Sequence, residues 1–282
     1  MEFNPGFREL SLMIFDTPVS FVEAVKHLSA KALLPTSLDS AAIRALDAGL
    51  RRQSLFSAKT LSEDLLGRYR EVITSIVDPR QVVRSEAAGA LSVTEGYDPA
   101  SARLSIKQLL GEIGYQAREG EAGTIKDLGS DRRINLVVKT NVQLAHGAGR
   151  FVQQNADADV VDLWPALEFV RFEGRKEPRD WDGANGLWIQ ACRRAGDDAA
   201  IRVWGATGRM CALKASGVWG ELGNSVYVEG GLDNPYPPFA FGSGMWTEEM
   251  SRDEAEEIGL LDKGEQAEAA QFDLASLFGE AA

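Results

Sequence analysis

The stretch from Ser130 to Trp181 constrains the fold most, because a long helical pattern is followed there by a strand pattern. Apolar and small side chains repeat at helical spacing, at Ile134, Val137, Val138, Asn141, Ala145, Ala148 and Val152. Ser130 is suited to cap this helix, with Asp131 in its first turn. Residues 167–173 then switch to a short alternation of apolar and aromatic side chains, with Leu167, Phe169 and Arg171 set against Glu168, Val170 and Phe172, which is typical of a strand. The sequence therefore predicts a central helix over residues 131–152, followed by mixed structure.

Composition and patterning predict an α+β protein in three parts. The 282 residues allow one large domain or two ordinary ones. Residues 1–155 are predicted to be mainly helical, and this part includes the central helix. All six tryptophans lie between Trp164 and Trp246, among many glycines, so residues 156–261 are predicted to form a smaller mixed α+β domain with an aromatic core. Residues 262–282 form an acidic tail, either frayed or carrying a short docking helix around Phe272 and Leu277.

Local signals predict the remaining elements. Helices are expected from about Ser20, from Leu38, from the Thr60–Glu63 capping box, over residues 80–91, and from Asp98 to Gly114. A further helix should begin at Ser251 and stop at Gly259. Strands are expected at 167–173, 201–204 and 225–228. His27 falls in the first helix, where we expect a surface or packing role.

The central helix has two unusual features. Asn141 lies within its apolar stripe, so we expect it to be buried and to hold backbone groups of a neighbouring segment. Replacing it with Leu would then cost roughly 1–3 kcal/mol. Gly147 and Gly149 each cost helix stability of about 1 kcal/mol relative to Ala. Either these small residues let another segment pack closely, or Thr140, Asn141 and Arg150 form a polar seam that positions the following strand.

The same stretch carries a resemblance to a known family. The run from Arg133 through Thr140 and Asn141 to Arg150 is followed by Pro-Ala-Leu-Glu-Phe-Val-Arg from Pro165 to Arg171. A Tyr-Pro-Pro-Phe sequence begins at Tyr236. In this order the motifs resemble the core of the phage Mu F-like minor head, or head morphogenesis, proteins, over about residues 130 to 245. Relatives often carry a Cys-Arg-Cys after the Pro-Pro motif; Ser243 and Met245 stand there here, so no metal or thiol role carries over.

The resemblance implies a structural, non-enzymatic protein that binds the portal protein and other procapsid components. It implies a location in the bacterial host cytoplasm during assembly and in the virion head afterwards. Large aromatic residues and arginines concentrate the binding energy of interfaces. The candidate docking residues are Trp219, Tyr236, Pro237, Pro238, Phe239 and Trp246. The candidate structural-motif residues are Asn141, Arg150, Arg171, Arg175, Arg179, Asp180 and Trp181.

Motifs of catalysis and metal binding are largely missing from the sequence. Asn155-x-Asp157-x-Asp159 starts like a calcium loop, but Val160 and Ala166 occupy positions that need Gly and Glu. Gly147-Ala148-Gly149 lies inside a helix, so it is no dinucleotide loop. We therefore expect no metal and no cofactor. The alternative function is a hydrolase or toxin-like enzyme that uses Asp180, His146 or Cys211, the last or Cys192 pairing with His146.

Charge and hydropathy limit the partners. The net charge is −12, which opposes direct binding of nucleic acid. No apolar run is long enough for a membrane span, and no secretory signal is recognisable. The two cysteines form no disulfide framework, which fits a reducing cytoplasm. Asp180 and Asp182 are expected to form an ion-pair network with Arg171, Arg175 and Arg179 rather than an acid pair.

Overall fold

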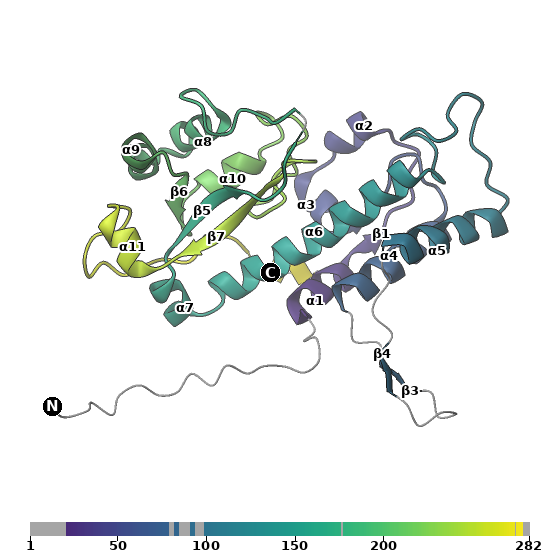
Figure 1. Cartoon of the computed structure of the whole chain (residues 1–282), viewed down its shortest axis with the longest axis horizontal. Coiled ribbons are helices and arrows are strands. Elements are labelled where there is room, and N and C mark those ends of the chain that lie inside the picture. The colour runs from purple at the N-terminus through teal and green to yellow at the C-terminus, as the bar shows by residue number, and fades with distance from the viewer. Residues whose placement is uncertain are drawn as a thin grey trace.

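A computed structural model describes residues 21–78, 82–84, 91–93, 99–175, 177–273 and 275–278, and the fold is α+β. The central helix α6 (Asp131–Asn155) runs between a helical half and a half built on a small sheet (Figure 1). The hydroxyl of Ser130 accepts a hydrogen bond from the backbone N–H of Arg133 at 3.2 Å, which is the predicted N-cap. The long helix expected over residues 131–152 is confirmed.

The helical half packs three further helices against α6: α1 (Val22–Ala30), α4 (Glu63–Val77) and α5 (Pro99–Glu112). Their apolar faces, with that of α6, enclose a core that includes Leu28, Tyr69, Ile73, Ile106 and Ile134. The α4 helix is capped by Ser62, whose hydroxyl accepts from Leu65 N at 3.1 Å. The capping signals thus predicted the start of α4 and the start of α6 to within two residues.

Two predictions in this half are corrected. The single helix expected from Leu38 is two short ones, α2 (Ser40–Arg44) and α3 (Ala48–Arg52), because Asp47 caps a second start by accepting from Leu50 N. They connect β1 (Ala32–Leu33) to its parallel partner β2 (Ser54–Leu55). In place of the helix expected over 80–91, β3 (Val82–Arg84) pairs antiparallel with β4 (Leu91–Val93). The rest of that helix lies outside the described residues.

The second half is built on a three-stranded antiparallel sheet. The strand β5 (Ala166–Arg171) lies between β6 (Cys211–Leu213) and β7 (Met245–Met250), so Leu167 faces Ala212 on one side and Glu249 on the other. The helices α8 (Leu187–Ala195) and α10 (Val218–Gly223) pack together beside the sheet. Trp181, Trp188 and Trp219 are buried in the core of this half, which confirms the aromatic core expected for it.

Several C-terminal elements differ from the expectation. The strand predicted at 201–204 lies in α9 (Asp198–Thr207), which Asp197 caps by accepting from Ala200 N at 2.8 Å. Residues 225–228 form turns instead of a strand. The helix α7 (Ala158–Leu163) follows α6 directly. The helix α11 (Arg252–Glu257) begins at the predicted cap, Ser251.

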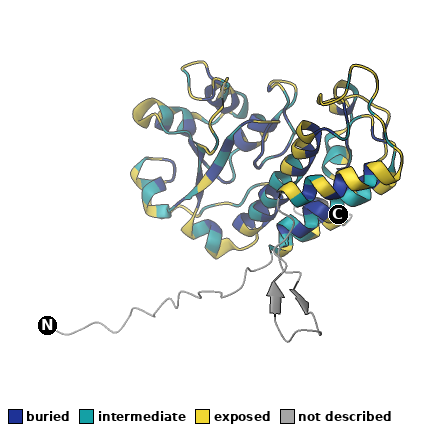
Figure 2. Cartoon of the chain, turned by 45° about the vertical axis from the view of Figure 1, so that its right-hand side comes forward, coloured by how far each residue is buried: buried dark blue, intermediate teal, exposed yellow. Residues whose placement is uncertain are grey.

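The glycines of α6 permit two close crossings. A Cβ atom on Gly147 would lie 1.6 Å from the carbonyl oxygen of Pro237, and one on Gly149 would lie 2.7 Å from Ala24 N of α1. The close-packing interpretation of these small residues is confirmed. Figure 2 shows the result: the stretch of α6 that lies between the two halves is largely buried.

The described part of the C-terminal tail packs against α1 and α6. Its backbone N–H at Ala270 donates to the side-chain oxygen of Asn155 at 2.8 Å. The 3₁₀ helix η1 (Ala275–Phe278) contacts α1, and Leu277 is buried against residues of α6. Of the two expectations for the tail, the docking segment is the one observed for these residues.

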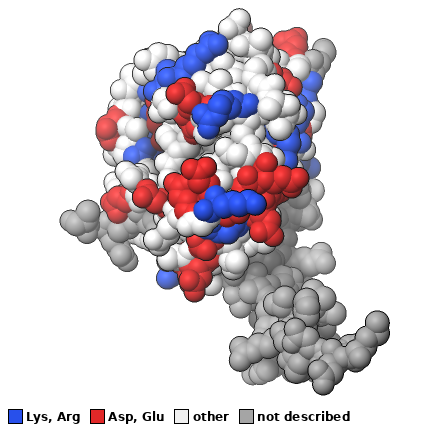
Figure 3. All heavy atoms as spheres, turned by 90° about the vertical axis from the view of Figure 1, so that its left-hand side faces the viewer, with Lys and Arg blue, Asp and Glu red and all other residues white. Residues whose placement is uncertain are grey.

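The surface matches the acidic composition. Figure 3 views the side where α9 and α11 lie and shows acidic groups gathered around isolated basic ones. Ion pairs of this kind join Arg209 to Glu168 and Glu254, and Arg252 to Asp162 and Glu256. In the described ranges, no helix combines the length and the hydropathy that crossing a bilayer requires.

A candidate docking surface between α6 and β7

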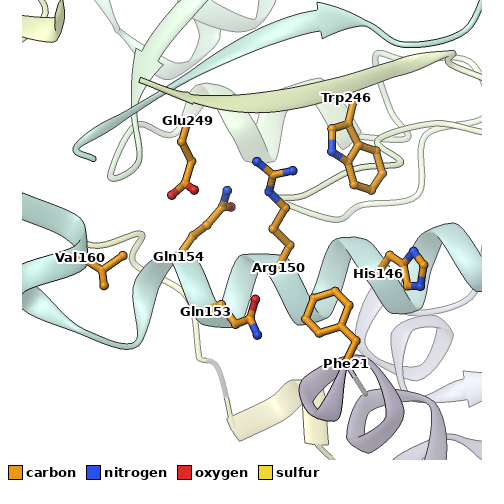
Figure 4. A pocket seen from close by; sticks show the side chains of 8 residues that line it. All are labelled: Phe21, His146, Arg150, Gln153, Gln154, Val160, Trp246 and Glu249. Atoms are coloured by element: carbon orange, nitrogen blue, oxygen red, sulfur yellow. The ribbon is translucent and has the colours of Figure 1, made fainter. Parts of the chain in front are cut away.

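A hollow of about 560 Å³ lies where the last turns of α6 face β7. Arg150 and Gln154 extend from α6 toward β7, from which Trp246 and Glu249 reach back toward the helix (Figure 4). The lining residues are Phe21, His146, Arg150, Gln153, Gln154, Val160, Trp246 and Glu249. The spacing of His146, Arg150 and Gln154 by four residues places them on one helix face, so α6 supplies one wall of the hollow.

Electrostatics leave Arg150 as the free charge of this hollow. The carboxylate of Glu249 accepts a hydrogen bond at 3.1 Å from Lys214 Nζ, which also donates to Gln154 O at 2.9 Å. Lys214 is buried, and burial lowers its pKa while Glu249 opposes that shift. Glu249 is therefore engaged with Lys214. Among the described residues, Arg150 has no ion-pair or hydrogen-bond partner, so its guanidinium is available to an acidic group from outside.

Trp246, which lines the hollow, packs against a second aromatic residue. Trp246 is half-buried, and its ring centroid lies 6.2 Å from that of Phe172, which is 70% exposed. Strand pairing brings the two rings together. Val170 on β5 faces Trp246 on β7, and Phe172 follows two residues after Val170, on the same side of the strand. Partly exposed tryptophan and arginine side chains are among the residues that most often dominate the energy of protein interfaces. The arrangement can bind a protein segment that carries a carboxylate and an apolar side chain.

His146 contributes an uncharged wall. Its ring packs against Phe21, with centroids 5.8 Å apart, and burial lowers its pKa below the ordinary value. At neutral pH the imidazole is therefore neutral. Gln154 Nε2, buried about two turns further along the same helix face, has no hydrogen-bond partner among the described residues. The hollow thus offers an unused amide donor as well as the Arg150 cation.

The structure corrects most of the predicted docking residues. Trp219 and Phe239 are buried in the sheet-side core, and Tyr236 is buried against Phe151 of α6. Pro237 and Pro238, joined by a cis peptide bond, are buried too. These residues are wrong as surface anchors, because their apolar area is already covered by the chain's own core. Trp246 alone of the six remains partly exposed.

The predicted structural-motif residues serve separate local roles. Asn141 is only half-buried, and its amide donates at 2.9 Å to Val137 O in its own helix, so it does not hold a neighbouring segment. The prediction that Thr140, Asn141 and Arg150 form one polar seam is therefore wrong for Asn141. Thr140 and Asn141 line a different cavity from Arg150.

The expected ion-pair network around Asp180 does not form within the described ranges. Asp180 is exposed and accepts from Gly183 N at 2.9 Å, which shapes the turn that contains the buried Trp181. Arg179 donates to the carbonyl oxygens of Glu229 and Phe241 at 3.1 and 3.0 Å. Arg175 pairs with Glu173 at 3.7 Å, and Arg171 is exposed at the end of β5.

The residues of the alternative enzymatic function are dispersed. His146 lines the hollow, but Asp180 and Cys211 do not. Burial raises the pKa of both Cys211 and Cys192 to about 12, so neither thiol ionises near neutral pH. Over the described part of the chain, no group of three or more His, Cys, Asp or Glu side chains could hold a metal ion.

Sequence reasoning missed most of the wall opposite Arg150. Lys214 and Glu249 lie far apart in the chain and meet only because β5 pairs with both β6 and β7. No local pattern predicts that pairing. The four-residue spacing of His146, Arg150 and Gln154 is the one signal that marks a shared helix face.

Comparisons with known proteins bring no relative. No protein-family model, no curated protein and no solved structure matches this chain.

Proposed function

We propose that the chain is a structural, non-enzymatic minor head protein of a phage or prophage that binds the portal protein during procapsid assembly. The hollow between α6 and β7 is its docking surface. The observation that carries this proposal is the unpaired Arg150 beside the partly exposed Trp246, on the helix and next to the strand where the family-like motifs lie. On this proposal the protein works in the host cytoplasm during assembly and then in the virion head.

The roles of the other motif residues support the proposal. Gly147 of α6 lies against the backbone of Pro237, and Phe169 of β5 packs on Phe239 at 5.5 Å. The three motifs of the resemblance therefore meet in one packed unit, which presents Arg150 and Trp246 without needing a nucleophile or a metal. A carboxylate from the portal protein would complete the charge of Arg150, and an apolar side chain would cover Trp246.

The test is co-expression with the portal protein encoded in the same prophage, followed by size-exclusion chromatography and analysis of particle composition. Arg150→Glu and Trp246→Ala should each remove the chain from portal complexes. Arg202→Glu is the matched control, since Arg202 is exposed on α9 outside the hollow and undergoes the same charge reversal. Circular dichroism must show that all variants are folded.

Two results would overturn the proposal. One is the absence of the parent chain from both portal complexes and procapsids. The other is a hydrolytic activity that is lost on changing Asp180 or His146 while the fold remains intact.

A further inference from the structure

A second cavity, of about 400 Å³, lies between the α2–α3 region, the first part of α6 and the loop around residues 229–241. We call it the cationic cavity after its six basic lining residues: Lys31, Arg44, Arg51, Arg52, Arg133 and Arg179. Glu229 is its one acidic lining residue. The chain as a whole has 42 acidic and 30 basic residues, so this concentration of positive charge runs against the composition.

Some of this charge is neutralised within the chain. Arg51 forms an ion pair with Asp233, which also accepts from Ser225 N at 2.7 Å. Arg179 donates to the carbonyl oxygens of Glu229 and Phe241 at 3.1 and 3.0 Å. Arg51 is therefore neutralised by its ion pair, and Arg179 lies beside the one acidic lining residue without forming an ion pair with it in the described structure.

Three others have no carboxylate partner among the described residues. Lys31 Nζ is buried and donates to Arg52 O at 2.6 Å. Arg52 Nη1 donates to Asp233 O at 2.9 Å. Arg133, also buried, donates to Ser57 Oγ at 2.6 Å and to Ala58 O at 2.7 Å. Carbonyl and hydroxyl oxygens satisfy hydrogen bonds but do not neutralise charge, and buried unpaired charges are costly.

Two unused donors strengthen the case for a ligand. Asn234 is 1% exposed, lines the cavity, and its amide nitrogen has no hydrogen-bond partner in the described structure. Arg133 Nε is also buried and has no hydrogen-bond partner in the described structure. Buried polar groups are nearly always hydrogen-bonded, so two such donors beside one cavity indicate an acceptor that binds from outside.

The remaining walls are apolar. They consist of Ile43, Phe56, Leu136, Leu144, Leu232 and Phe241. A free inorganic anion would leave these surfaces uncovered, whereas an apolar molecule alone would leave the cations and the amide unsatisfied. The volume is within the range of small-molecule sites.

From this geometry we infer that the cationic cavity binds a small phosphorylated molecule with an apolar or aromatic body. The phosphate accepts from Asn234 and Arg133 and neutralises the charge of Lys31 and Arg52, because its several oxygens and double charge match a cluster of forked donors better than one carboxylate does. The apolar body covers Ile43, Leu136 and Phe241. This site is separate from the hollow at Arg150 and does not depend on portal binding.

The test uses 1-naphthyl phosphate as the probe, with 1-naphthol and inorganic phosphate as its two halves. Isothermal titration of the full chain should show saturable binding of the probe at one site, at least about tenfold tighter than either half, since charge and apolar contacts act together. Binding should weaken in high salt, because screening reduces the charge term.

Substitutions of lining residues test whether the probe binds in the cationic cavity. Arg44→Gln, at an exposed position of the lining, should weaken binding several-fold without unfolding the chain, and Lys31→Met should weaken it about tenfold. Arg193→Gln, exposed on α8 outside the cavity, is the control and should bind like the parent. If Lys31→Met is unfolded, Arg44→Gln decides. The inference fails if the parent does not bind the probe, if either half binds as tightly, or if Arg44→Gln binds like the control.

Discussion

At the residue scale, His27 makes the stability of the fold sensitive to acid. Its Nδ1 lies 2.8 Å from the carbonyl oxygen of Leu277, to which it donates, while Nε2 is buried without a described partner. Burial, followed by the nearby charge of Lys31, lowers the pKa of His27 to about 3. Its ordinary value is 6.5. Between those values the unfolded chain binds a proton that the folded chain does not, so stability is lost as the pH falls.

We therefore predict that His27→Gln reduces the acid sensitivity. Between pH 7 and pH 4.5 the parent should lose about 2–3 kcal/mol more of its free energy of unfolding than the variant does, because each unit of pKa difference corresponds to about 1.4 kcal/mol. Urea denaturation at the two pH values measures this. An equal loss in parent and variant would contradict the burial of a neutral His27.

Asn141 shows why a residue's role is harder to predict than its helix. The apolar stripe placed it on the inner face of α6 correctly, but that face borders the cationic cavity at this point, so the side chain is half-buried and bonds its own helix. A helical stripe indicates which face of a helix points to the protein interior. It cannot indicate where that face borders a cavity instead of a packed neighbour.

The expected effect of Asn141→Leu changes accordingly. The substitution removes one hydrogen bond within the helix and leaves no partner in another segment unsatisfied. We predict a change in the free energy of unfolding within about 0.5 kcal/mol, as for surface substitutions. Thermal denaturation measures it, and a loss of 1–3 kcal/mol would restore the role first expected for Asn141.

At the element scale, the crossing of α6 with the Pro237 loop depends on one missing side chain. A Cβ atom on Gly147 would overlap the Pro237 carbonyl oxygen and approach the ring of Tyr236 at 3.2 Å. Both belong to packed backbone and core, which do not yield easily. Gly147→Ala should therefore lower the free energy of unfolding by about 3 kcal/mol or more.

Gly205→Ala is the matched control for Gly147→Ala. Gly205 lies in α9, is exposed, and its Cβ would meet no atom within 4 Å. Alanine there should stabilise the chain by about 0.5–1 kcal/mol through the backbone entropy of glycine. Chemical denaturation of both variants compares them, and similar behaviour would show that α6 does not approach the loop so closely.

The elements that the sequence predicted are those with local causes. The helices α4, α5, α6 and α11 have an apolar stripe, a capping residue or both, and these act within a few residues. The strands β6 and β7 were missed because three and six residues carry little periodicity, and their stability comes from pairing with β5. The segment 201–204, with Ile201, Val203 and Trp204, was misassigned because the Asp197 cap and the buried Val203 favour a helix in this context.

At the scale of the whole molecule, only part of the candidate site was predicted from the sequence. Arg150 and Trp246 were named from the sequence, whereas Lys214 and Glu249, whose mutual ion pair leaves Arg150 as the free charge of the hollow, were not. Aromatic residues near the Pro-Pro sequence were expected outside and lie inside, since large apolar side chains are used first to fill a core. Composition cannot divide tryptophans between core and surface. That division depends on which faces the sheet and α6 cover.

The C-terminal segment contacts both halves of the molecule. Phe272 lies edge-on to Phe151 of α6, with centroids 5.7 Å apart, and under the guanidinium of Arg52 at 5.6 Å. Five residues later, Leu277 is buried in the cluster formed with Phe151 and Tyr236. The segment therefore covers apolar surface from α6 and from the Pro237 loop at the same time.

We predict that Leu277→Ala lowers the free energy of unfolding by about 2–4 kcal/mol, the usual cost of removing a buried leucine side chain. Leu163→Ala is the control, because Leu163 is an equally large side chain that is 62% exposed at the end of α7, and its loss should cost less than about 0.5 kcal/mol. Urea denaturation followed by tryptophan fluorescence reports on the sheet-side core, where Trp181, Trp188 and Trp219 lie. If the C-terminal segment supports the whole molecule, Leu277→Ala shifts this transition even though no tryptophan belongs to the Leu277 cluster. An unchanged transition would mean that the segment packs on the surface without stabilising the fold beneath it.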